Sequence, residues 1–189
     1  MLIALIKQQH RRDAFMLENN ELKIHLATAF SNLVSFIDHT NRNGACHDTS
    51  AIFYILSSEL GFSPKLYIGE VRDPFTGAYF DHSWVEIDGN IYDAAIAYPL
   101  SGGVRVSGTI FNSIDQDTGE KTNLEFGFNS ESGLDFIAYQ VSQQTLDQYE
   151  AVTNSGIWDI SSSQGINIGL DLDEFLLSLK YGNVMREII

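Results

Sequence analysis

Apolar and polar positions recur with two different periods along the chain, and these periods predict its helices and strands. From Asn20 to Thr40 the apolar residues recur every three or four positions, which predicts a helix with one apolar face. Asn20-Glu21 is the start signal, and turn-forming residues follow Thr40. Residues 46–60 predict a second helix, closed by Gly61. Its middle is apolar nearly all round, as in helices that are buried on several sides.

Two strands and a tight hairpin are predicted next. Residues 65–71 and 80–87 alternate in polarity and are rich in β-branched and aromatic side chains. Asp88-Gly89 is a strong signal for a two-residue hairpin, which leads into residues 90–93. The pattern therefore predicts an antiparallel sheet after the second helix.

The hairpin determines which side chains face one another. With Asp88 and Gly89 in the loop, Trp84 lies opposite Asp93, and His82 shares the face of Trp84. Asp93 is then the diagonal neighbour of His82, within side-chain reach. A loop of three residues would move Asp93 to the opposite face, so the prediction depends on this one turn.

The second half of the chain is less regular. We expect two strands over 102–111 and 122–128, joined by a turn at 115–120, and a short strand over 136–141. A helix should follow over 142–151, with Leu146 and Tyr149 inward, and loops at 155–156 and 161–165. The last helix should have Asp171 as its N-cap and Glu174 in a capping box, and its buried side chains should be Phe175, Leu176, Leu179 and Val184. This order of elements is typical of the α+β class. We expect a single domain over 1–189, with a core at 20–95 that residues 96–189 elaborate.

The composition excludes several classes of protein. The 189 residues are 44% hydrophobic and 19% charged, as in ordinary globular proteins, and their net charge of −14 makes nucleic acid a poor partner. One cysteine cannot form an internal disulfide, which favours a reducing compartment and a cytoplasmic location. The apolar start of the chain is too short for a signal peptide, and no run approaches the roughly 18 apolar residues of a membrane helix.

Three residues can supply the chemistry of a thiol enzyme. Cys46 stands in the first turn of a predicted helix, where free N–H groups and the helix dipole favour a thiolate. His82 can take the thiol proton, and Asp93 can orient and stabilise the imidazolium. A lone buried cysteine is usually structural. The ordered set of cysteine, strand histidine and hairpin aspartate favours catalysis.

The residues around these three resemble a known group. Gly44-Ala45-Cys46-His47-Asp48 is similar to the Gly-x-Cys-x-Asp motif of the transglutaminase-like cysteine proteins, which include transglutaminases, microbial thiol peptidases, peptide N-glycanases and, more distantly, arylamine N-acetyltransferases. Residues 61–66 resemble their Gly-Ile-Pro-Ala-Arg element, and residues 82–87 resemble their His-Ala-Trp-Val-Glu strand. Tyr92-Asp93 matches the aromatic-Asp pair that follows the histidine strand in this group. The likeness covers residues 41–95, and Thr49-Ser50 and Ala94 depart from the pattern.

The resemblance implies a papain-like fold, with the nucleophile helix packed on an antiparallel sheet, and a catalytic triad of Cys46, His82 and Asp93. It implies acyl transfer or hydrolysis at a peptide or protein amide, without a cofactor or metal. The backbone N–H of Cys46 would hold the oxyanion, with Asn43 or Trp84 as a second donor. Asn43 can equally be a turn residue, and Trp84 a core residue.

Three alternatives remain open at this point. Acyl transfer from acetyl-CoA would need a basic groove, which the acidic sequence after residue 100 disfavours. A catalytically silent binding module would keep the three residues under a covered cleft. A metal site from Cys46, His47, His82 and Asp93 is disfavoured because adjacent helical residues diverge by about 100°. The acyl acceptor, water or amine, and the oligomeric state also stay open.

Overall fold

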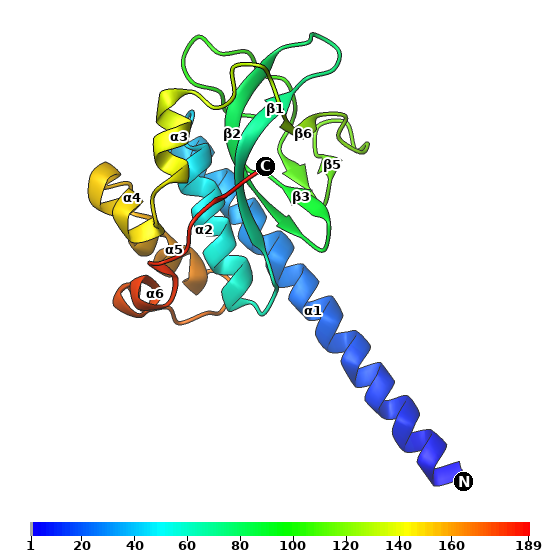
Figure 1. Cartoon of the computed structure of the whole chain (residues 1–189). Coiled ribbons are helices and arrows are strands. Elements are labelled where there is room, and N and C mark those ends of the chain that lie inside the picture. Colours follow the sequence, from blue (N-terminus) through cyan, green and yellow to red (C-terminus); the bar gives the residue numbers. More distant parts are fainter. Residues whose placement is uncertain (1) are drawn as a thin grey trace.

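The computed structural model describes the backbone of residues 2–189 and the side chains of residues 20–189. The helices are α1 (Leu2–Thr40), α2 (Cys46–Glu59), α3 (Phe136–Ser142), α4 (Leu146–Thr153), α5 (Ile157–Ile166) and α6 (Glu174–Tyr181). The strands are β1 (Lys65–Arg72), β2 (Tyr79–Ile87), β3 (Asn90–Tyr92), β4 (Ile110–Phe111), β5 (Ile114–Asp115), β6 (Glu125–Phe128) and β7 (Glu187–Ile188) (Figure 1). Helices combine with a mostly antiparallel sheet, which confirms the α+β class.

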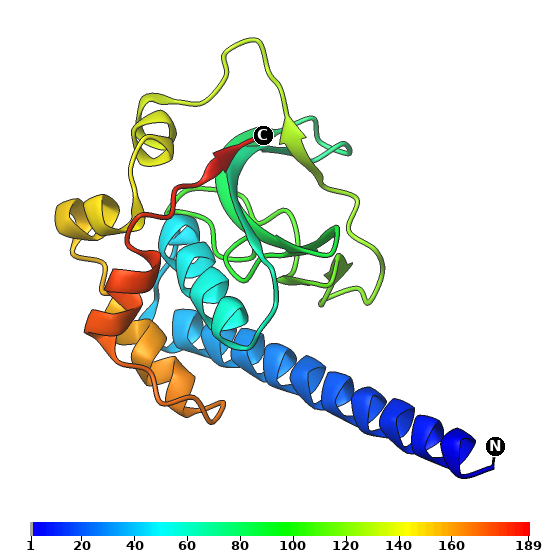
Figure 2. The same ribbon diagram turned by 60° about the horizontal axis from the view of Figure 1, so that its bottom comes forward.

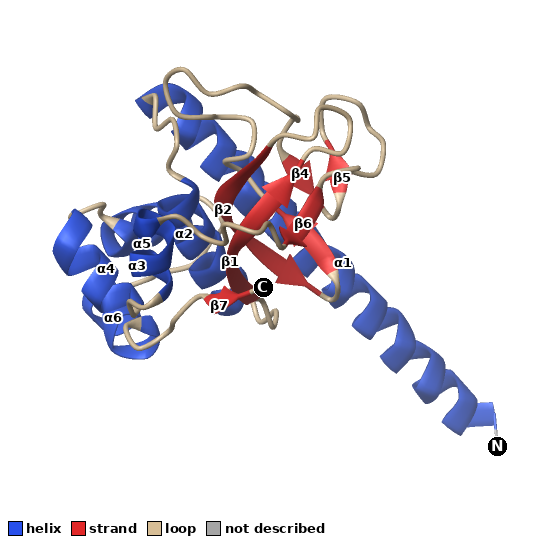
Figure 3. Ribbon diagram, turned by 45° about the horizontal axis from the view of Figure 1, so that its top comes forward, coloured by secondary structure: helices blue, strands red, loops and turns tan. Residues whose placement is uncertain are grey.

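The main sheet has the order β3-β2-β1-β6, and β7 adds to β1 in parallel. Figure 3 shows helices α2 to α6 gathered on one side of these strands. One core lies between the helices and the sheet and contains Leu33, Ile52, Ile68 and Val85. A second, smaller core on the other sheet face contains Val71, Trp84 and Ile110. No helix in the described part of the chain is both long enough and apolar enough to cross a bilayer.

The first helix starts earlier than predicted. We expected it to begin at Asn20-Glu21, but α1 runs without a break from Leu2 and extends well past the rest of the molecule (Figure 2). The reason is that no glycine or proline precedes Gly44, so nothing in the sequence interrupts a helix. Its predicted end is confirmed, because Asn41 follows in the left-handed region, with φ of 49°.

The second helix and the hairpin follow the prediction. Gly61 follows α2 with φ of 90°, a conformation that glycine adopts without strain. Asp88 and Gly89 both have positive φ, as a primed hairpin turn requires. The resulting pairs, among them Ile87 with Asn90, are those predicted.

Of the two strands expected beyond Pro99, the second is present as β6, whereas most of the first is absent from the described structure. Residues 102–109 form a loop, and only Ile110–Phe111 becomes a strand, which pairs with β5. Gly102, Gly103 and Gly108 weaken strand formation there. The turn at 115–120 is present, but β6 pairs with β1 instead of with residues 102–111.

Three predictions in the last third were wrong. Residues 136–142 are helix α3, because Asp135 caps its N-terminus by accepting a hydrogen bond from the N–H of Ala138 at 2.8 Å. Residues 161–165 belong to α5 and not to a loop. Helix α4 begins at Leu146, later than expected, although Leu146 and Tyr149 are buried as predicted.

The last helix differs in its cap and in its buried face. Asp173, not Asp171, is the N-cap, and it accepts a hydrogen bond from the N–H of Leu176. Leu177 and Tyr181 are buried. Of the four side chains that we expected to be buried, Phe175, Leu176 and Leu179 are largely exposed, and Val184 is partly buried against the core. Leu177 and Tyr181 are four residues apart and so share one helix face, and tertiary packing places this face against the core.

Candidate functional site

Cys46 is the first residue of α2 and is nearly buried, at 9% exposure. The preceding Gly44 has φ of 72°, and its N–H donates to the carbonyl of Tyr98 at 2.8 Å. Among residues 20–189, no side chain caps the start of α2. The thiol therefore lies at the positive end of a helix dipole whose first amides stay free to bind a negative charge.

His82 and Asp93 form a buried pair, as the hairpin register predicts. His82 Nε2 is 2.7 Å from Asp93 Oδ2, and their side chains are 7% and 2% exposed. Neither of these two atoms has another hydrogen-bond partner among the described residues. The pair is thus sequestered from water, and the interaction between two charges is stronger in the protein interior than in water.

The second oxygen of Asp93 has a different task. Asp93 Oδ1 accepts hydrogen bonds from the N–H groups of Ala95 and Ile96, each at 3.0 Å. The backbone of Asp93 pairs with Ile110 through two further hydrogen bonds of 2.8 and 2.9 Å. One carboxylate therefore orients His82 and also fixes the start of the loop that follows β3.

The charges of this group support a thiolate–imidazolium pair. Burial alone would raise the pKa of the Cys46 thiol, but the imidazoles of His47 and His82 bring this pKa well below its usual value. Burial alone would lower the pKa of His82, but Asp93 and Cys46 raise it to about 10. Both shifts favour the charged forms, the thiolate of Cys46 and the imidazolium of His82.

His47, which was not predicted as part of the site, also lies beside the thiol. Its Nδ1 lies 3.8 Å from Cys46 Sγ and 2.7 Å from the hydroxyl of Ser83. Cys46 thus has two imidazole neighbours, one from its own helix and one from β2. The adjacency of Cys46 and His47 was the available signal, but we had considered it only for metal binding.

A second missed cluster supports the first turn of α2. The guanidinium of Arg186, from the end of the chain, donates to the carbonyl of His47 at 2.9 Å and lies 4.6 Å from the ring centroid of Tyr149. Tyr149 donates a hydrogen bond to Asp48, which also pairs with Arg42 at 3.2 Å. Burial lowers the pKa of Arg186. These contacts hold the start of α2 against the C-terminal half of the chain.

The two proposed oxyanion donors lie elsewhere. Asn43 is exposed in the turn before α2. Trp84 is 1% exposed and packs edge-to-face on Phe126, with 5.0 Å between the ring centroids. Trp84 therefore belongs to the second core, and neither side chain is among those that line the cavity at Cys46.

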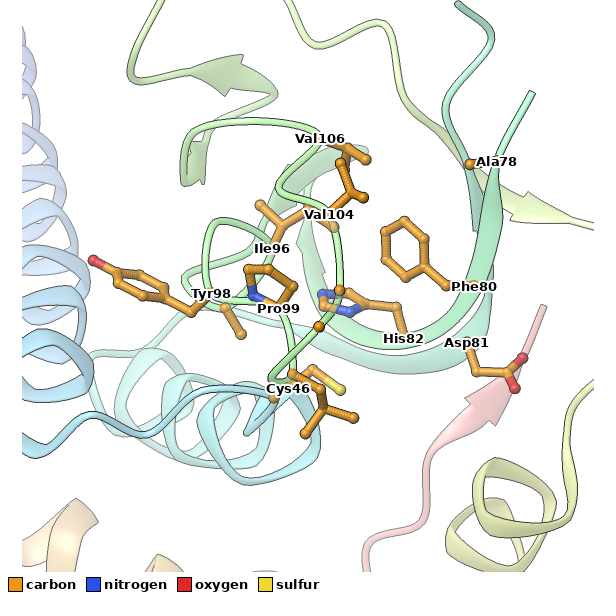
Figure 4. A pocket seen from close by; sticks show the side chains of 15 residues that line it. Cys46, Ala78, Phe80, Asp81, His82, Ile96, Tyr98, Pro99, Val104 and Val106 are labelled. Atoms are coloured by element: carbon orange, nitrogen blue, oxygen red, sulfur yellow. The ribbon is translucent and has the colours of Figure 1, made fainter. Parts of the chain in front are cut away.

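A cavity of about 430 Å³ opens beside Cys46 and His82. Figure 4 shows Phe80 of β2 on one wall and the segment from Ile96 to Val106 on the opposite wall. Among the described residues that line the cavity, four have titratable side chains: Cys46, His82, Asp81 and Tyr98. A ligand in this cavity would be in contact with the thiol and the imidazole.

Metal ligation and relationship to known proteins give no further guide. Among the side chains of residues 20–189, no group of three or more His, Cys, Asp and Glu is placed to hold a metal ion. Comparisons of this chain with protein-family models, with curated proteins and with solved structures found no match. The function of this chain is therefore inferred from the geometry of the site itself.

Proposed function

We propose that this chain catalyses cysteine-dependent hydrolysis or acyl transfer at an amide bond, through a thiol acyl-enzyme on a papain-like, transglutaminase-type core. The observation that carries the proposal is the buried His82–Asp93 pair, 2.7 Å apart, beside the thiol of Cys46 and next to a cavity. The substrate class is a peptide or protein amide. A reducing, cytoplasmic location and a single domain belong to the same proposal.

The first half of the reaction forms the acyl-enzyme. The Cys46 thiolate attacks the amide carbonyl, and the free N–H at the start of α2 stabilises the oxyanion that develops. The His82 imidazolium then gives its proton to the departing amine as the C–N bond breaks. Asp93 keeps the ring in place, because its Oδ2 binds Nε2 and leaves Nδ1 for the reacting groups.

The second half releases the acyl group. His82, now neutral, takes a proton from water or from an amine, which attacks the thioester. The thioester bond breaks, and Cys46 returns to the thiolate while His82 regains its charge. Hydrolysis and transamidation differ only in this acceptor.

One observation favours a second candidate, a catalytically silent binding module on the same scaffold. Cys46 is only 9% exposed, so access to the thiol depends on the cavity. In such a module a ligand would occupy the cavity and no acyl-enzyme would form. Reactivity of the thiol in the native protein separates the two candidates.

The test is alkylation of Cys46 by iodoacetamide at pH 6, followed by mass spectrometry. We expect Cys46 to react faster than free cysteine, and His82→Ala to slow the reaction at least tenfold. His39→Ala is the matched control, because His39 is exposed at the end of α1. A native protein whose Cys46 reacts no faster than free cysteine, with no effect of His82→Ala, rules out the activated pair.

Turnover is tested with a library of peptide amides. We expect the wild type to release amine or ammonia from some members, and Cys46→Ala to release none. A reactive Cys46 without turnover of any amide would favour the binding module.

A further inference from the structure

We propose that the cavity at Cys46 selects substrates with a bulky, uncharged apolar group next to the scissile amide, and that it rejects an anionic group there. This inference rests on the proposed function, because it names the substrate class of the same site.

The size and lining of the cavity support this selectivity. Its volume is about 430 Å³, within the range of roughly 300–1,000 Å³ that is usual for small-molecule sites. Apolar side chains from both walls face it, including Phe80, Ile96, Pro99, Val104 and Val106. A branched or aromatic side chain that enters the cavity would leave water for a mostly apolar surface.

The loop wall is fixed to the same residues that position the reacting groups. The start of the wall is bound by Asp93 Oδ1, and its Tyr98 carbonyl accepts from the N–H of Gly44 at 2.8 Å. A Cβ atom on Gly44 would lie 2.2 Å from Leu100 Cδ2, so this close approach depends on glycine. The cavity is therefore a formed part of the site.

The apolar lining of the cavity also disfavours anions. Asp81 lines both this cavity and a neighbouring hollow that contains Glu70 and Asp135. Asp81 Oδ2 accepts from the N–H of Asp135 at 2.9 Å, and no cation pairs with these three carboxylates among the described residues. The Asp81 carboxylate points away from Phe80 and His82 (Figure 4), so a carboxylate on the substrate would leave water for the mostly apolar side chains of this cavity.

The first test compares three alkylating reagents with the same reactive carbon: chloroacetamide, N-phenethyl chloroacetamide and N-carboxymethyl chloroacetamide. In each reaction the Cys46 sulfur bonds to carbon and chloride leaves. Changes of one methylene in an apolar pocket alter selectivity by about 10–200-fold. We therefore expect the phenethyl reagent to react at least tenfold faster than chloroacetamide, and the anionic reagent to react more slowly. Equal rates for the three would overturn the proposal.

A matched pair of variants localises the effect. Val104 lines the cavity and is 80% exposed, whereas Val152 on α4 is 72% exposed and does not line it. We expect Val104→Asp to reduce the ratio of the phenethyl rate to the chloroacetamide rate at least tenfold, and Val152→Asp to leave this ratio unchanged. A preference that survives Val104→Asp also overturns the proposal.

A second measurement does not depend on thiol chemistry. In the Cys46→Ala variant, N-phenethylacetamide should shift the methyl NMR signals of Ile96, Val104 and Val106, and N-acetylglycine should not. If these shifts occur while native Cys46 is unreactive, the pocket is correct and the proposed enzyme is wrong. If native Cys46 is reactive but neither preference nor shifts are found, the enzyme stands and the pocket proposal fails.

Discussion

Asp93→Asn probes the ion pair without removing the loop contacts. An asparagine keeps a side-chain oxygen that can accept from Ala95 and Ile96, but it lacks the charge that lies 2.7 Å from His82 Nε2. Without that charge, burial lowers the pKa of His82. The imidazolium is then lost at neutral pH, and the Cys46 thiolate loses its partner.

The size of the effect follows from the pKa of His82. Its rise from 6.5 to about 10 corresponds to about 5 kcal/mol in favour of the charged ring, and removing one partner of a buried pair costs about 3–5 kcal/mol. Because the folded pKa lies above the unfolded one, this stabilisation is fully present below pH 6.5 and is lost as pH rises through about 10. We therefore expect Asp93→Asn to lower the free energy of unfolding by about 3 kcal/mol near pH 6, and by less as pH approaches 10.

The assay is the pH dependence of Cys46 alkylation, together with urea denaturation at several pH values. The lowered pKa of Cys46 should give the wild type a plateau rate that begins well below the usual range of a thiol. In Asp93→Asn the rate of Cys46 alkylation should rise only in the pH range where an ordinary thiol ionises. Asp173→Asn is the matched control, since Asp173 caps α6 and should leave the alkylation profile unchanged. If the Asp93→Asn profile coincides with that of the wild type, the reasoning on the pair is wrong.

Three further substitutions test the surrounding structure by urea denaturation. Leu177→Ala should lower the free energy of unfolding by about 2–5 kcal/mol because Leu177 is buried. Leu179→Ala, on the exposed side of α6, should change the free energy of unfolding by less than about 0.5 kcal/mol. Similar losses for the two variants would contradict the orientation of α6. Tyr149→Phe removes the hydrogen bond to Asp48 and should cost about 1–3 kcal/mol, and an unchanged midpoint would mean that this bond contributes nothing. Gly44→Ala must hold a positive φ, which should cost about 1–2 kcal/mol, and its Cβ must also displace Leu100, which adds to that cost. A stability equal to wild type would show that the turn and Leu100 relax freely.

The local sequence was sufficient for the helix and the hairpin that carry the site. The turn residues Asp88-Gly89 determine the register by their own backbone preferences, and the register brings Asp93 to His82. Gly61 likewise marks the end of α2. Short-range conformational preferences determine these features, so no knowledge of the tertiary fold was needed.

Features that depend on distant contacts could not be predicted in the same way. Arg186 meets His47 across 139 positions of sequence, and no local pattern indicates that a C-terminal arginine is buried against α2. The segment 102–109 alternates like a strand, but its glycines and its place at the cavity keep it a loop. The buried face of α6 depends on how α5 and the C-terminus pack around it.

The loop that forms one wall of the cavity has a segment that is hydrogen-bonded to Asp93 and a segment that is not. Up to Ile96 the chain is tied to the carboxylate that holds His82, so a change there alters reactivity and binding together. Residues 100–104 are exposed, and the hydrogen bond from the N–H of Gly103 to the carbonyl of Leu100 stays within the loop. The proposed selectivity should therefore be open to redesign in this segment while the His82–Asp93 pair is left in place.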